Sequence, residues 1–198
     1  SHVEQVLAKS ELNFLYLSML RDKQERGEIV DVDKLPEGFA SFYKEQMDRI
    51  LKERLPQGIG SDSVLQLIGT IIGSLEPLHV EQELPALSGL DLGTVEAILM
   101  KTELSQLFPV RDDDLVYVCH KSLVDWLKRE PPYDHRHYGH EFELKRAELE
   151  LLTRHGLAEK PVDEAAWTEA LEKVSSLTYW QRWIEAHLER LRQMNNEW

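Results

Sequence analysis

The feature that most constrains the fold of this chain is the spacing of its apolar residues. These residues recur every three or four positions along nearly the whole sequence. An α-helix returns a side chain to the same face with that period, so the pattern predicts amphipathic helices rather than strands. We expect helices within residues 3–21, 36–55, 62–75, 80–87, 92–106, 120–130, 138–155, 164–174 and 180–191. Ser61 or Asp62 should cap the third of these helices, Pro85 should strain the fourth, and Asp91 should cap the fifth. Gly156 should close the helix over 138–155. The predicted fold class is therefore mainly α, a helical bundle.

One segment breaks the helical pattern. Residues 107–110 and 115–118 are short β-prone runs, and the polar residues 111–114 lie between them. Two such runs joined by a short polar loop are typical of a β-hairpin, and we expect no other β-structure. Helices, a two-stranded wing and a further helix then follow one another in the order of a winged-helix module. The helices after it could begin a superhelical array.

The charge of the chain limits its partners. Its 198 residues include 36 acidic and 23 basic ones, for a formal net charge of −13. Such a field repels the phosphates of nucleic acids and anionic lipid headgroups. A DNA-binding winged helix would also need a basic recognition helix, whereas residues 92–106 carry Lys101 alone. We expect neither nucleic acid nor a membrane as partner.

Several features indicate a cytoplasmic protein. Cys119 is the single cysteine, so no intramolecular disulfide can form. No basic-then-apolar signal segment opens the chain, and the longest uncharged apolar stretch, residues 64–75, is too short to cross a bilayer. Ser1 and His2 look like the remnant of a cleaved tag, so we expect a piece of a longer protein.

Residues 118–127 read Val-Cys-His-Lys-Ser-Leu-Val-Asp-Trp-Leu. This stretch resembles NACHT-type members of the STAND signal-transduction ATPases, in which a wing strand runs into a helix that starts His-x-Ser-hydrophobic-x-Asp-aromatic-Leu. The residues that match that pattern are His120, Ser122, Leu123, Asp125, Trp126 and Leu127.

A second stretch is similar to the same family. Residues 9–16 and 35–39, followed by Tyr43, resemble its Lys-Ser-x-Gly-Asn-Phe-Leu-Tyr helix and its Leu-Pro-x-Gly-hydrophobic continuation, with Leu12 in place of the glycine. Residues 138–140, and residues 179–180 together with 187–188, also resemble the pattern that follows the winged helix. Taken together, these motifs cover most of the chain, and they occur in the same order as in the family.

The resemblance implies three units: a helical lid segment over 1–56, a winged-helix domain over 57–132 and a C-terminal helical segment over 133–198. In that family the histidine at the wing-to-helix junction contacts the β-phosphate of ADP, a role that falls here on His120. Asp125, one turn into that helix, would be a structural partner for the wing. Phe14 would lie near the adenine, and the alternative for Phe14 is packing in the helical core. The implied function is a regulatory module of a nucleotide-switched ATPase, whose partners are the ATPase and repeat domains of the parent chain and other proteins.

No chemistry is predicted for the chain itself. It lacks a Gly-x-x-x-x-Gly-Lys-Ser/Thr loop, so we expect no enzyme and no cofactor here, whereas the parent protein would bind ATP or ADP with Mg²⁺. The alternative function is a helical adaptor for protein–protein interaction, in which His120 is only a helix cap.

Two further groups of residues could in principle carry chemistry. His135, His137 and His140 have spacings that a metal could use, but no second ligand pair of fixed spacing accompanies them, so we predict no metal site. Glu148 and Glu150 fit an exposed helix face and give no sign of acid–base catalysis.

Overall fold

The computed structural model describes residues 2–9, 14–25, 27, 38–53, 55–130, 144, 147–157, 168–169, 171–172, 174 and 177–196. This part of the chain is mainly helical with one small antiparallel sheet, which confirms the fold class in its coarse form. In the described ranges, none of the helices combines the length and the apolar character needed to cross a bilayer.

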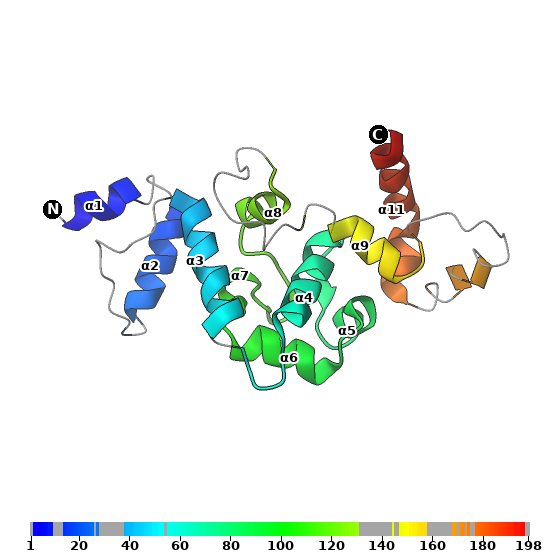
Figure 1. Cartoon of the computed structure of the whole chain (residues 1–198), viewed down its shortest axis with the longest axis horizontal. Coiled ribbons are helices and arrows are strands. Elements are labelled where there is room, and N and C mark those ends of the chain that lie inside the picture. Colours follow the sequence, from blue (N-terminus) through cyan, green and yellow to red (C-terminus); the bar gives the residue numbers. More distant parts are fainter. Residues whose placement is uncertain are drawn as a thin grey trace.

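The helices are α1 (His2–Lys9), α2 (Phe14–Glu25), α3 (Gly38–Glu53), α4 (Ser61–Gly73), α5 (Glu83–Ser88), α6 (Leu92–Lys101), α7 (Leu104–Leu107), α8 (Lys121–Lys128), α9 (Ala147–Arg154) and α11 (Thr178–Asn196). The strands are β1 (Leu78–His79) and β2 (Leu115–Val116). Figure 1 shows α1–α3 at one end, α4–α8 in the centre and α9 with α11 at the other, so the two termini lie far apart.

The predicted hairpin is present. Val110 forms an antiparallel bridge with Val116, and the Tyr117 and Cys119 N–H groups donate to the carbonyls of Pro109 and Leu107, each at 2.9 Å. The expectation of no other β-structure was wrong, because β1 pairs with the far side of β2, with Leu78 opposite Val116. Two residues are too few to show a strand period, so β1 could not be predicted from the pattern of residues.

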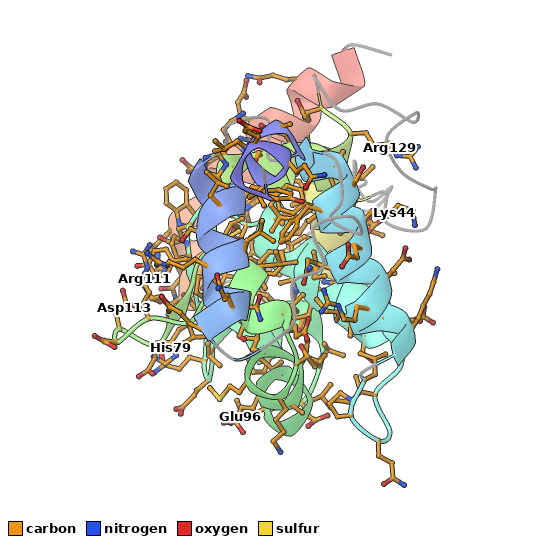
Figure 2. The ribbon with its side chains drawn as sticks, turned by 90° about the vertical axis from the view of Figure 1, so that its left-hand side faces the viewer. Lys44, His79, Glu96, Arg111, Asp113 and Arg129 are labelled. Atoms are coloured by element: carbon orange, nitrogen blue, oxygen red, sulfur yellow. The ribbon has the colours of Figure 1, made fainter. Side chains whose placement is uncertain are left out.

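The tip of the hairpin is a three-residue loop held by its own side chains. Arg111 N–H donates to Leu115 O at 3.1 Å, and Asp114 adopts a left-handed φ of +57°, as three-residue hairpin loops require. Tyr117 O–H donates to Asp113 at 2.8 Å while the Arg111 guanidinium stacks on its ring. In Figure 2, Arg111 and Asp113 lie near His79, on the side opposite Lys44 and Arg129.

Replacing Asp114 with glycine should stabilise the protein by about 0.5–1 kcal/mol, because glycine adopts the left-handed conformation without steric cost. Urea denaturation measures the change. Asp112→Gly is the control within the same loop, and it should lower stability slightly, since Asp112 is not among the residues with positive φ. Equal effects of the two substitutions would contradict the loop geometry.

The N-terminal caps of α6 and α4 can be compared with those expected from the sequence. Asp91 caps α6 as predicted, with its Oδ1 accepting from Thr94 N–H at 3.0 Å. The expectation that Ser61 or Asp62 caps α4 was wrong, because the N-cap is Gly60 and no side-chain cap hydrogen bond is present.

The start of α5 and the end of α9 are explained by the backbone properties of proline and glycine. Pro85 does not strain its helix, contrary to expectation, since α5 begins at Glu83 and a first-turn residue needs no intrahelical N–H bond. Gly156 closes α9 as predicted: its φ is +72°, and Leu157 N–H reaches back to Leu152 O at 2.8 Å.

The central core surrounds α4. Its inward face is completely or almost completely buried, through Val64, Leu67, Ile68, Ile71 and Ile72. α4 also approaches α9 backbone to backbone, because a Cβ built on Gly73 would lie 2.8 Å from Ala147 O, whereas one on Gly69 has no neighbour closer than 3.9 Å. Glycine at 73 is therefore what lets the two helices come together.

Aromatic side chains join the N-terminal helices to α8. Tyr43 on α3 packs on Trp126 of α8 with ring centroids 5.6 Å apart, and Phe42 packs on Tyr16 of α2 at 5.1 Å. All four side chains are buried. The proposed boundary near residue 56 thus separates segments that share an aromatic contact.

Several expected elements lie partly outside the described residues. The helix expected over 3–21 is described as α1 and α2, with 10–13 outside, and the helix expected over 138–155 is described from Ala147 on. Trp167 and Trp198 also fall outside, whereas Trp180 is buried in α11.

Candidate functional site

His120 lies where the hairpin passes into α8. Its backbone is extended (φ −160°, ψ 148°), and its Nδ1 accepts a hydrogen bond from Ser122 N–H at 3.1 Å, which makes it the N-cap of α8. Because Nδ1 accepts, the neutral ring carries its proton on Nε2. The residue is exposed, so the predicted cap is confirmed and the ring stands at a helix N-terminus, where the dipole favours anions.

A hydrogen-bonded chain connects this imidazole to the N-terminal helices. The Ser122 hydroxyl lies 2.7 Å from His120 Nδ1 and 2.8 Å from the Tyr43 hydroxyl. With Nδ1 as acceptor, Ser122 O–H donates to the ring and accepts from Tyr43 O–H. Since Tyr43 is buried on α3, the orientation of His120 depends on how α3 packs on α8.

α8 is itself held firmly. Leu123, Trp126 and Leu127 are fully buried on one face, and Arg129 ends the helix in a left-handed conformation. We expected Asp125 to partner the wing, but its carboxylate accepts from Lys121 of the same helix, at 2.9 Å. The site therefore has a rigid base.

Phe14, the second predicted nucleotide contact, is the first residue of α2, and its side chain lies outside the described part of the chain. The next described side chain of that helix, Tyr16, is buried against Phe42. The described side chains do not bring Phe14 and His120 together.

The Cys119 thiol next to His120 is a weak nucleophile. The residue is half-buried, and burial raises the pKa of the Cys119 thiol to about 11, although backbone hydrogen bonds lower it in part. Because the thiolate is the reactive form, the folded chain keeps this cysteine unreactive at neutral pH.

Iodoacetamide should therefore alkylate Cys119 about 10-fold more slowly in the folded chain at pH 8 than in the urea-unfolded chain. The thiolate population falls by roughly 100-fold, and the higher nucleophilicity of a more basic thiolate restores part of the rate. Mass spectrometry of quenched time points measures both rates. Equal rates would show that the thiol is not buried in solution.

No metal centre emerges in the described ranges, where no group of three His, Cys, Asp or Glu side chains could hold an ion. The three histidines considered as possible metal ligands, His135, His137 and His140, lie outside those ranges.

Glu148 is not on an exposed helix face, contrary to expectation. Glu150 is exposed as expected, but Glu148 has a side chain only 14% exposed, and it accepts a hydrogen bond from His187 Nδ1 at 2.7 Å. His187 is fully buried in α11. The two residues therefore form a largely buried hydrogen bond between α9 and α11.

This contact belongs to a longer buried chain. Leu75 N–H donates to the Tyr179 hydroxyl at 2.9 Å, and Tyr179 O–H lies 2.7 Å from His187 Nε2. With Glu148 accepting at Nδ1, every donor from Leu75 N–H to the carboxylate has an acceptor. A chain of this kind fastens α11 to α4 and α9. The sequence placed Tyr179 and His187 two helical turns apart and in one motif, but nothing in it indicated that their side chains meet Leu75 and Glu148.

Comparison of the chain with models of protein families, with curated proteins and with solved structures finds no match in any of the three. Any family assignment therefore depends on the motifs and on the geometry of the chain itself.

Proposed function

We propose that this chain is a non-catalytic regulatory module of a nucleotide-switched signalling ATPase of the NACHT type. Residues 57–132 act as its winged-helix domain, and His120 senses the β-phosphate of ADP bound, with Mg²⁺, to an ATPase domain elsewhere in the parent cytoplasmic protein. The C-terminal helices connect the module to a repeat domain. Nucleotide exchange would then shift the winged helix between two positions.

The order of the elements supports the winged-helix part of this proposal. Helix α4, strand β1, helices α5 and α6, and then the hairpin ending in β2 occur in this order along the chain, with the four-residue helix α7 inserted between α6 and the hairpin. Winged-helix modules have this order of helices and strands. The acidic tip at Asp112, Asp113 and Asp114 favours a protein partner over DNA.

The exposed imidazole of His120 carries the sensing part of the proposal. It lies at the N-terminus of α8, its tautomer has the proton on Nε2, and Ser122 and Tyr43 fix its orientation. An N–H donor held in this way can bind a phosphate oxygen and release it when two domains separate.

One observation favours the alternative, a helical adaptor with no nucleotide role. His120 already caps α8, and a cap alone would account for a histidine at this position. The two functions differ in whether a change at His120 alters nucleotide affinity.

The experiment is ADP titration of the parent protein, ATPase domain included, with and without His120→Ala. Loss of a charge-assisted hydrogen bond should weaken ADP binding by about 1–3 kcal/mol, or roughly 5- to 150-fold. Tyr43→Phe removes the far end of the hydrogen-bonded chain and should weaken binding less. Unchanged affinity in a folded His120→Ala protein would reject the sensor and favour the adaptor.

A further inference from the structure

A pocket of about 570 Å³ lies between three parts of the chain: the end of α4 with the residues just after it, residues 116–118 at the end of β2, and α8. That volume is within the range of small-molecule sites, which are mostly apolar with a few placed polar groups. Most of the lining is apolar, from Ile71, Ile72, Leu75, Val116, Val118 and Val124. α8 contributes Val124 and two lysines, Lys121 and Lys128, which lie on the same helix face. Val124 is about one turn from each lysine, and the two lysines are two turns apart.

The two other lining charges near this apolar surface are already paired. Glu76 accepts from Arg182 Nε of α11 at 2.8 Å. Lys121 donates to Asp125 at 2.9 Å, and its side chain is 84% exposed, so water screens it well.

Lys128 differs from both. It is half-buried, and burial lowers the pKa of its ammonium group, while Glu148, Glu130 and other charges of the chain act on it over longer distances. No carboxylate of the described residues forms an ion pair with it within 4.0 Å. A partly desolvated cation beside an apolar surface is costly unless an anion accompanies it.

We propose that this pocket binds a monocarboxylate with an unbranched apolar body, such as a medium-chain fatty acid, with its carboxylate on Lys128 and its chain along the α4 and β2 residues. A lysine ammonium is a point charge and suits a single anionic group. A phosphate dianion would meet greater repulsion from Glu76, on the pocket wall, and from Glu148, which acts on Lys128. The site is independent of His120 and of nucleotide.

The test is isothermal titration of the full chain with decanoate below its micellar concentration, in about 0.15 M salt. At that ionic strength the Debye length is about 8 Å, so remote acidic residues are largely screened while a pocket charge is not. Saturable 1:1 binding is expected, and decanol should bind at least 10-fold more weakly because it lacks the charge.

Three variants locate the ligand. Lys128→Met keeps the apolar stem without the charge and should weaken decanoate binding at least 10-fold, whereas Lys121→Met, the matched control on the same helix face, should change it less than 2-fold. Val124→Trp should abolish binding by filling the pocket, and it decides the question if Lys128→Met does not fold. Absence of saturable binding, equal binding of decanol, or full affinity in a folded Lys128→Met or Val124→Trp variant would overturn the proposal.

Discussion

Replacing Gly73 with alanine should destabilise the protein by about 3 kcal/mol, because the added methyl would lie 2.8 Å from Ala147 O and 2.9 Å from Ala147 C. Both atoms belong to the backbone of α9, so no side-chain rotation relieves the contact. Relief requires α4 and α9 to separate, and separation loses packing along their whole interface. In urea denaturation the midpoint should fall while the m-value stays unchanged.

Gly69→Ala is the matched control, one helical turn earlier on the same buried helix. Its new methyl would have no neighbour closer than 3.9 Å, an ordinary van der Waals distance. Alanine also favours helix by up to about 1 kcal/mol over glycine, so this variant should be as stable as the parent or more so. If the two substitutions had the same effect, the close approach at Gly73 would not exist in solution.

The second large effect should come from His187→Ala, with an expected loss of about 3–5 kcal/mol. The substitution opens a cavity at a fully buried position. It also removes the hydrogen-bond donor of Glu148 Oε1 and the acceptor of the Tyr179 hydroxyl, while Arg190, at 3.4 Å, still donates to the Glu148 carboxylate. Thermal and urea unfolding measure the loss, and Glu185→Ala, an exposed position on the same helix, should have almost no effect.

The same contact should produce an acid dependence of stability. Burial by itself would raise the pKa of Glu148, but the hydrogen bond from His187 and the charges of His187 and Arg190 hold the pKa below its ordinary value. A depressed folded-state pKa means that the carboxylate stabilises the protein above the ordinary glutamate pKa, about 4.3. This stabilisation is lost as the pH falls from there through the folded-state pKa.

Glu148→Gln should accordingly show a smaller loss of stability than the parent chain between pH 5 and pH 3. Unfolding free energies measured at several pH values give the comparison, with Glu150→Gln as the exposed control on the same helix. Parallel pH profiles for parent and Glu148→Gln would show that this carboxylate titrates at its ordinary pKa.

The sequence predicted local features well because their causes are local. Leu123, Trp126 and Leu127 recur with helical spacing, which indicated α8, and His120 before them indicated its cap. Asp91 and Gly156 marked helix ends for the same reason. In each case the residue and the backbone group that it contacts are within a few positions of each other.

Contacts between distant residues could not be predicted in this way. Ser122 and Tyr43 are 79 positions apart, and Glu148 and His187 are 39 apart. Glu148 accordingly looked like one of many surface carboxylates, because α11 packs on α9 only in the folded chain. The exposure of His120 and the pocket beside Lys128 likewise depend on how helices meet, which periodicity does not specify.

The hydrogen bond from Leu75 N–H to Tyr179 also has a consequence for the chain as it leaves the ribosome. Its two partners are separated by 104 positions. At about 5–20 residues per second, Tyr179 is made about 5–20 seconds after Leu75. During that interval α4 and the hairpin can form, but Leu75 N–H, just after α4, must bond to water instead. The nascent central part is therefore exposed to proteases and chaperones at this point until α11 emerges and closes it.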